Sequence, residues 1–283
     1  MNKIMMCGGD LRQIVAANIL SDYGFEVCFY KNMATPLLSD RVEVLSDADF
    51  ESCKTVVLPL PCSKDDVHLN CDFSDKPYLE DIFSHFSAKH RVYGGRLTPY
   101  IKGLADRMGV DAVDILENEG FSIKNAYLTA EAAIKIAISE SRAGLLGMKV
   151  LVVGYGRIGK CLAYLLKNMG AYVNVSARKE SDLAWIECFG YNAVETKTVA
   201  QRAGEFDIIF NTVPVNLFKP SQLSEKTVYI ELASKPYGIS FDEAEKAGKN
   251  VVLAPSLPGK VSPVAAGKII AQTVIKLEKE GRN

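Results

Sequence analysis

Three glycines in the second half of the chain have the spacing of a phosphate-binding turn. The apolar run at 149–153 leads directly into Gly154, Gly156 and Gly159, and a segment of helical periodicity follows. The first glycine of such a turn permits the tight bend, the second lets a diphosphate approach the backbone, and the third lets the helix lie close to the strand. Unpaired amides at the start of the helix then face the phosphates. We therefore predict a dinucleotide site that comprises Gly154, Gly156, Arg157, Ile158 and Gly159.

The end of the next predicted strand bears on which dinucleotide binds. This strand ends in Ser176, Ala177 and Arg178, where NAD enzymes usually carry an acidic residue that accepts hydrogen bonds from the ribose hydroxyls. A serine hydroxyl and a guanidinium can instead contact a 2′-phosphate. The pattern favours NADP, bound through Ser176 and Arg178, over NAD; for Arg178 the competing interpretation is a solvated surface charge.

Another predicted strand, at 207–211, runs into a small polar residue and a proline. Thr212, Val213 and Pro214 follow it directly. Because such groups commonly line the nicotinamide side of a dinucleotide cleft, we assign these three residues that role.

Alternating strands and helices must position these residues. In the second half we expect a six-stranded domain and place five of its strands, at 149–153, 172–176, 207–211, 227–232 and 250–254. In the first half we expect strands at 3–7, 25–30, 42–45, 55–60, 92–93 and 113–116. This alternation predicts an α/β protein with two doubly wound parallel-sheet domains, of which the C-terminal one is a Rossmann fold.

A break in periodicity between Phe121 and Thr129 marks the predicted domain boundary. Thr129 is expected to cap a connecting helix at 129–143. We therefore place a substrate domain at 1–124 and a dinucleotide domain at 125–263, and we expect the last helix, at 264–283, to pack back on the first domain.

The amino-acid composition argues against several classes of protein. Its 33 basic and 34 acidic residues are scattered, so nothing favours a nucleic-acid partner. No apolar run is long enough to span a membrane, and the N-terminus does not resemble a signal peptide. Seven dispersed cysteines favour the cytoplasm over a disulfide-stapled secreted domain. Cys62, His68 and Cys71 lack the spacing of a zinc site, and no metal is expected.

A series of motifs in a fixed order resembles the family of dipicolinate synthase A subunits. The resemblance spans nearly the whole chain, and its most selective motifs are GGDLRQ at 8–13 and APSLPGKVSPVAAGKI at 254–269. The others are NAYLTAEAAIKIAI at 125–138, VVGYGRIGK at 152–160, SAR at 176–178, FNTVP at 210–214 and LASKPYG at 232–238. The chain departs from the family pattern at Tyr155, Tyr237 and Lys260.

The resemblance implies an oxidoreductase that converts dihydrodipicolinate, or its hydrated precursor after loss of water, to dipicolinate, with hydride transfer to NADP. It also implies a flavoprotein-like second subunit and a place in the mother-cell cytoplasm of a sporulating bacterium. Self-association and the hydration state of the substrate are left open. No general base is assigned either, because the three histidines all lie in the first half.

A dicarboxylate substrate calls for cations and polar groups near the cleft. We assign catalytic roles to Lys235, Ser234 and Arg12, and substrate binding to Arg12, Asn125, Thr129 and Lys260. Arg12 lies beside the Gly8–Gly9 turn, and Ser234 and Lys235 follow the predicted strand at 227–232. Lys260 is expected in a loop rich in proline and glycine. For each charged residue the competing interpretation is an ordinary surface charge.

Two alternatives stay open at this stage. The first is a non-catalytic subunit that binds NADP as a scaffold or redox sensor for a flavoprotein partner. The second is an enzyme similar to the methylenetetrahydrofolate dehydrogenases, suggested by the PSLPG run at 255–259, although the tyrosine and lysine pair of that family is not recognisable.

Overall fold

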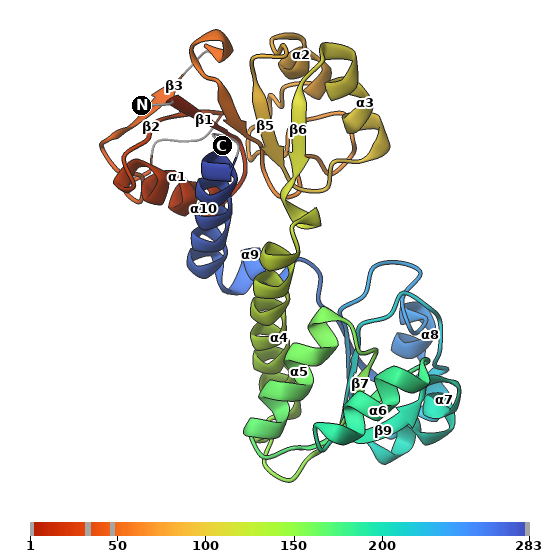
Figure 1. The fold of residues 1–283 in the computed structure, drawn as a ribbon. Coiled ribbons are helices and arrows are strands. Elements are labelled where there is room, and N and C mark those ends of the chain that lie inside the picture. Colours follow the sequence, from red (N-terminus) through yellow and green to blue (C-terminus); the bar gives the residue numbers. More distant parts are fainter. Residues whose placement is uncertain (1–2, 32–34, 46–48, 281–283) are drawn as a thin grey trace. The chain divides into compact units, whose positions relative to one another are not determined.

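The computed structural model describes residues 3–31, 35–45 and 49–280. The chain divides into two compact units (Figure 1). The first unit comprises Met1–Lys124 together with Ser262–Asn283, and the second unit comprises Asn125–Val261. The chain therefore passes from the first unit to the second and back.

The first unit is built on a parallel sheet of six strands in the order β3-β2-β1-β4-β5-β6. Its strands are β1 (Lys3–Cys7), β2 (Glu26–Tyr30), β3 (Val42–Leu45), β4 (Thr55–Val57), β5 (Arg91–Gly94) and β6 (Asp111–Asp114). Along β1, Ile4 and Met6 point to one face and Met5 and Cys7 to the other, and all four are buried. A strand that is apolar on both faces is typical of a parallel sheet covered on both sides.

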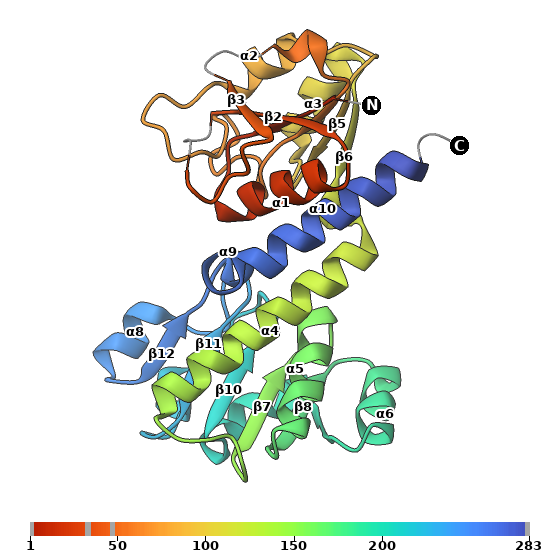
Figure 2. The same ribbon diagram turned by 90° about the vertical axis from the view of Figure 1, so that its left-hand side faces the viewer.

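Four helices cover the two faces of this sheet. Helices α2 (Leu79–Ser84) and α3 (Pro99–Met108) pack on the face of Met5, while α1 (Leu11–Asp22) and α10 (Pro263–Glu280) pack on the face of Ile4. Helices α1 and α10 lie side by side (Figure 2). They approach closely at Gly267, where a Cβ atom would lie 2.5 Å from the carbonyl oxygen of Arg12.

The second unit repeats this plan with the order β12-β11-β10-β7-β8-β9. Its strands are β7 (Lys149–Val153), β8 (Tyr172–Ala177), β9 (Asn192–Glu195), β10 (Ile208–Asn211), β11 (Val228–Glu231) and β12 (Asn250–Leu253). All neighbouring strands are parallel. The predicted fold class is confirmed, and β9 is the sixth strand, which the predicted ranges omit.

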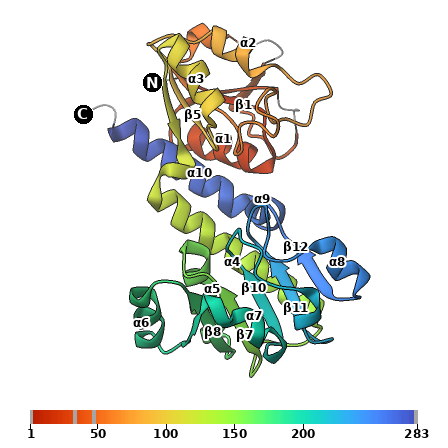
Figure 3. The same ribbon diagram turned by 90° about the vertical axis from the view of Figure 1, so that its right-hand side faces the viewer.

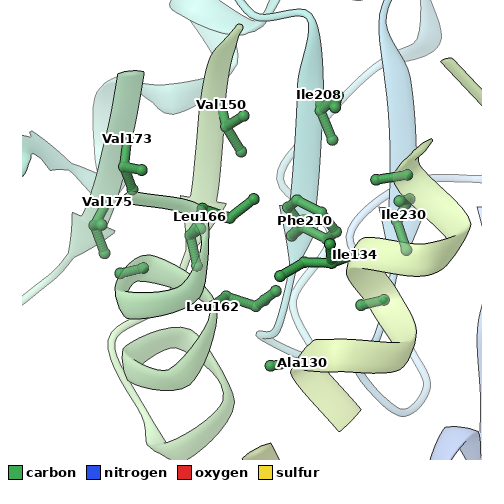
Figure 4. Close-up of a cluster of buried hydrophobic side chains, with 14 of the residues drawn as sticks. Ala130, Ile134, Val150, Leu162, Leu166, Val173, Val175, Ile208, Phe210 and Ile230 are labelled. Atoms are coloured by element: carbon green, nitrogen blue, oxygen red, sulfur yellow. The ribbon is translucent and has the colours of Figure 1, made fainter. Parts of the chain in front are cut away.

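Helices cover both faces of the second sheet. One face carries α4 (Glu119–Ser141), α5 (Arg157–Asn168) and α6 (Glu180–Cys188), and the other carries α7 (Val199–Arg202) and α8 (Phe241–Lys246). Figure 4 shows Ala130 and Ile134 of α4 beside Leu162 and Leu166 of α5, all directed at the strand side chains beneath them. The short α9 (Leu257–Val261) follows β12.

In both sheets the order of the strands reverses next to the first strand, between β1 and β4 in the first sheet and between β7 and β10 in the second. In open α/β sheets, ligands bind at such a switch point, outside the carboxyl ends of the strands. The two units thus offer one such edge each.

Three local predictions were wrong. Helix α4 begins at Glu119 rather than at 129, so Thr129 lies inside the helix; its hydroxyl donates to the Asn125 carbonyl at 2.9 Å and caps nothing. The predicted strand at 55–60 stops at Val57. Lys260, expected in a loop, lies in α9.

In the ranges that the structure describes, no helix has both the length and the apolar character that a membrane span requires.

Candidate functional site

The turn between β7 and α5 has the geometry that its glycines predict. Gly154 has a φ of +100°, a left-handed conformation that favours glycine. A Cβ atom at Gly159 would collide with the carbonyl oxygen of Gly154, so only glycine lets α5 lie this close to the turn. Together these two residues fix where the first turn of α5 begins.

Gly156 differs from the other two glycines. It is the N-cap of α5 with an ordinary φ of −80°, and no side chain caps the helix. A Cβ atom built there would meet nothing within 4 Å, so neither backbone strain nor internal packing requires a glycine. An exposed residue that leaves open space beside uncapped amides fits the approach of a diphosphate.

The end of β10 closes the turn from the side. Thr212 bonds twice to the Val153 carbonyl oxygen, through its backbone N–H at 3.0 Å and its hydroxyl at 2.7 Å. A Cβ atom at Gly154 would lie 2.6 Å from the Thr212 hydroxyl and 2.8 Å from a methyl group of Val213. The glycine turn therefore meets Thr212 and Val213 at the switch point, with Pro214 exposed just beyond them.

The two residues at the end of β8 that were assigned to a 2′-phosphate differ in exposure to solvent. Arg178 is exposed, and it has no ion pair or hydrogen bond within the described part of the chain. Ser176 is fully buried, and its hydroxyl lies 3.5 Å from that of Thr196. The assignment of Ser176 to the phosphate needs correction, because alternation along β8 turns its side chain into the sheet face that α7 covers. Of the two residues, only Arg178 is exposed, and its role toward a 2′-phosphate stays a prediction.

A buried carboxylate that sequence reasoning missed lies at the end of β11. Glu231 is completely buried and accepts four hydrogen bonds. Its Oε1 accepts from the Asn211 amide at 2.7 Å and from the Ala233 N–H at 3.0 Å, while its Oε2 accepts from the Gly238 N–H at 2.7 Å and from the Tyr229 hydroxyl at 3.2 Å. Burial raises the pKa of Glu231, against the opposing effect of these bonds. The sequence did contain a signal for this residue, because it shows a glutamate at the end of an otherwise apolar predicted strand.

Glu231 holds the loop that carries two of the predicted catalytic residues. Ser234 and Lys235 are exposed on the loop at 233–238, and a turn joins the Tyr237 N–H to the Ser234 carbonyl at 3.2 Å. The loop returns to the sheet at Gly238, where a Cβ atom would collide with the Tyr229 hydroxyl. The position of Lys235 and Ser234 therefore depends on the carboxylate beneath them.

Arg12 is less available than its place in the GGDLRQ motif suggested. Its Nε and Nη2 atoms both donate to the Asp10 carboxylate, at 2.9 Å and 2.8 Å, and Asp10 also accepts from the Arg12 backbone N–H at the start of α1. Burial favours a higher pKa for Asp10, but the hydrogen bonds and charge of Arg12 outweigh it and lower the pKa. One edge of the guanidinium is thus committed to Asp10.

The remaining predicted substrate residues lie in the second unit. Asn125 and Thr129 are half-buried and occupy successive turns of α4, and Lys260 is exposed on α9. Arg12 belongs to the first unit. Their roles toward substrate stay predictions.

No group of three or more histidine, cysteine or acidic side chains placed to hold a metal ion occurs in the described ranges. Cys62 and Cys71 are buried thiols, and His68 pairs with Asp65 at 2.8 Å.

Comparison with known proteins identifies the relatives of this chain. Residues 3–116 match the family of N-terminal domains of the dipicolinate synthase A subunit. The A subunit of dipicolinate synthase from Bacillus subtilis (strain 168) is 28% identical over 285 residues, which covers 98% of this chain and 96% of the relative. The chain is similar to a dipicolinate synthase A subunit over nearly its whole length.

Solved structures agree with this relationship. The A subunit of dipicolinate synthase from Bacillus halodurans superposes with a TM-score of 0.89 at 28% identity, covering 98% of this chain and 97% of that one. A transhydrogenase from Sinorhizobium meliloti, at 13% identity and a TM-score of 0.72, covers 98% of this chain and 93% of its own and shares the fold. The likeness to the dipicolinate synthase A subunits and the dinucleotide turn together support an NAD(P)-dependent dehydrogenase.

Proposed function

We propose that this chain oxidises a dihydrodipicolinate to dipicolinate and passes the hydride to NADP. The observation that carries the proposal is the uncapped start of α5 beside Gly156, in a chain whose similarity to a dipicolinate synthase A subunit extends over 98% of its length. A 4-hydroxy-tetrahydrodipicolinate that has lost water would supply the same dihydro compound.

The balance of the reaction is simple. A ring carbon of the substrate loses a hydride, a second ring position loses a proton, and the products are the aromatic pyridine dicarboxylate and reduced NADP. When bound, the oxidised nicotinamide supplies the hydride acceptor. Because aromatisation makes the loss of hydride favourable, the protein's main task is to hold the donor carbon over the nicotinamide.

Residues of the second unit have distinct parts in that task. The amides at 156–159 would bind the diphosphate, and Arg178 would bind the 2′-phosphate. Thr212, Val213 and Pro214 would flank the nicotinamide at the switch point. Each of these residues follows the carboxyl end of a strand, β7, β8 or β10.

The two carboxylates of the proposed substrate need positively charged side chains to bind them. Lys235, held by the loop above Glu231, is our first choice, with Ser234 as a hydrogen-bonding neighbour. Arg12, Lys260, Asn125 and Thr129 complete the proposed substrate-binding set. A flavoprotein-like second subunit and a place in the mother-cell cytoplasm of a sporulating bacterium are part of the same proposal.

The test uses the purified full chain with dihydrodipicolinate and NADP, alone and with its partner protein. Formation of reduced NADP in proportion to dipicolinate is the expected result. Binding of NADP without turnover under both conditions would leave a scaffold or redox sensor and would overturn the enzymatic proposal.

A further inference from the structure

A groove lined by aromatic side chains lies between α5 and α6 in the second unit, and one of its residues, Tyr155, comes from the turn between β7 and α5. Both helices pack on β8 (Figure 3). The groove has a volume of about 430 Å³ and is lined by Tyr155, Lys160, Tyr164, Trp185, Phe189 and Tyr191. Five of these six residues are aromatic, and all six belong to one unit.

Three of the five aromatic side chains in the groove are largely exposed, while Tyr155 and Tyr191 are partly buried. Tyr164, Trp185 and Phe189 keep 57%, 56% and 54% of their surface accessible. Trp185 and Phe189 stack with centroids 5.5 Å apart and planes 18° from parallel, so they present a flat apolar wall. Clustered apolar exposure of this kind marks binding sites, because side chains that serve only the core are normally covered.

Lys160 is the one charged residue that lines the groove. Its Nζ lies 5.2 Å from the centroid of the Tyr155 ring, and it has no carboxylate partner in the described ranges. Asp182 of α6 is close enough to contribute, after burial and Tyr191, to the raised pKa of Tyr155, but it does not line the groove. A ligand in the groove would therefore meet flat apolar walls and one unpaired positive charge.

We propose that this groove binds a planar aromatic carboxylate, with its ring against the aromatic walls and its carboxylate paired with Lys160. Small-molecule sites are typically of this volume and combine apolar walls with a few placed polar groups. The ring would gain stacking area, and the carboxylate would gain a charge-assisted hydrogen bond. A neutral or saturated ligand could use only part of this arrangement.

Trp185 makes the proposal directly measurable, because it is the only tryptophan in the chain. The full chain, saturated with NADP, is titrated with benzoate and with pyridine-2,6-dicarboxylate while tryptophan fluorescence is recorded. Cyclohexanecarboxylate lacks the aromatic ring, and benzamide lacks the charge. We expect a saturable change with the two aromatic acids and at least tenfold weaker binding of both control compounds. Benzoate has no part in the proposed reaction, so its binding does not depend on the proposed function.

Two variants test the contacts. Lys160→Met should weaken benzoate binding about 10- to 100-fold, the range of a lost hydrogen bond to a charged group. Lys197→Met removes an exposed lysine that pairs with Glu195 elsewhere in this unit, and should leave binding unchanged. Circular dichroism establishes that both variants fold.

Three results would each overturn the proposal. The first is equal binding of benzoate and cyclohexanecarboxylate, and the second is unchanged binding in the Lys160→Met variant. The third is competition between benzoate and NADP, which would place the acid in the dinucleotide site instead.

Discussion

The side-chain amide of Asn211 donates a 2.7 Å hydrogen bond to Oε1 of Glu231 and so joins the carboxyl ends of β10 and β11. The same amide also donates to the Val213 carbonyl at 2.9 Å. Glu231 in turn holds the backbone of the loop with Ser234 and Lys235. One buried pair therefore fixes both the residues assigned to the nicotinamide and those assigned to the substrate.

Replacing Glu231 should disturb the protein far more than replacing an exposed glutamate. In Glu231→Gln, an NH₂ group takes the place of an acceptor and faces buried donors, so we expect a loss of about 1–3 kcal/mol in the free energy of unfolding. Urea denaturation measures it. Glu225→Gln, which removes an exposed carboxylate paired with Lys249, is the matched control and should cost less than about 1 kcal/mol. Equal losses in the two variants would contradict a structural role for the buried network.

Arg178 should discriminate between the two nicotinamide dinucleotides. Loss of its contact to the 2′-phosphate in Arg178→Ala should weaken NADP binding by about 1.5–3 kcal/mol and leave NAD binding nearly unchanged. Titration calorimetry with both dinucleotides gives the comparison. Similar weakening of NADP and NAD would refute this assignment, and Lys197→Ala serves as a control for general charge effects.

Gly156 and Gly159 should separate binding from stability. Alanine at Gly156 meets open space, so Gly156→Ala should cost no more than about 1 kcal/mol, chiefly as a poorer N-cap, while dinucleotide binding is largely lost. Alanine at Gly159 collides with the Gly154 carbonyl, and we expect Gly159→Ala to lower the melting temperature markedly. Thermal denaturation and NADP titration on both variants test this contrast; a Gly156→Ala variant with normal affinity would rule out a diphosphate at this turn.

Asp10 should make stability depend on pH in acid. Its pKa in the folded protein is lowered from an ordinary value of 3.8, so its stabilising contribution is complete above that value and is lost as the pH falls through the folded-state pKa. Asp10→Ala also removes the N-cap of α1 and should cost about 1 kcal/mol at neutral pH. Asp10→Asn keeps a capping side chain, and its deficit relative to wild type should shrink toward low pH. A deficit that stays constant with pH would contradict the ionic contribution of Arg12.

The sequence predicted the sheets well because their signals are local. An apolar run, a glycine turn and a helical pattern of apolar residues lie within a short stretch of chain, as at 149–168. A strand, a turn and a helix can therefore be predicted from these residues alone. The start of α4 was missed because the residues from Phe121 to Thr129 mix polar and apolar types. Its signal was Asn118, whose side chain accepts from the Phe121 N–H at 2.9 Å.

The site was predicted less completely because some of its contacts are distant in sequence. The glycine turn and the position of Arg178 follow from motif spacing. The partners of Glu231 come from β10 and from a loop that returns at Gly238, and no local pattern contains them. Ser176 is buried because its side chain points to the face of the sheet that α7 covers. Motif spacing alone does not specify which helix covers which face.

Helix α10 places Ile270, Ala271 and Val274 in the core of the first unit, although the ribosome makes this helix only after the whole second unit. Until α10 emerges, the nascent first unit exposes the side of α1 that Gly267 later approaches. The part of the protein that is synthesised first is therefore completed last, and a nonsense mutation soon after residue 261 damages the N-terminal sheet rather than the dinucleotide turn.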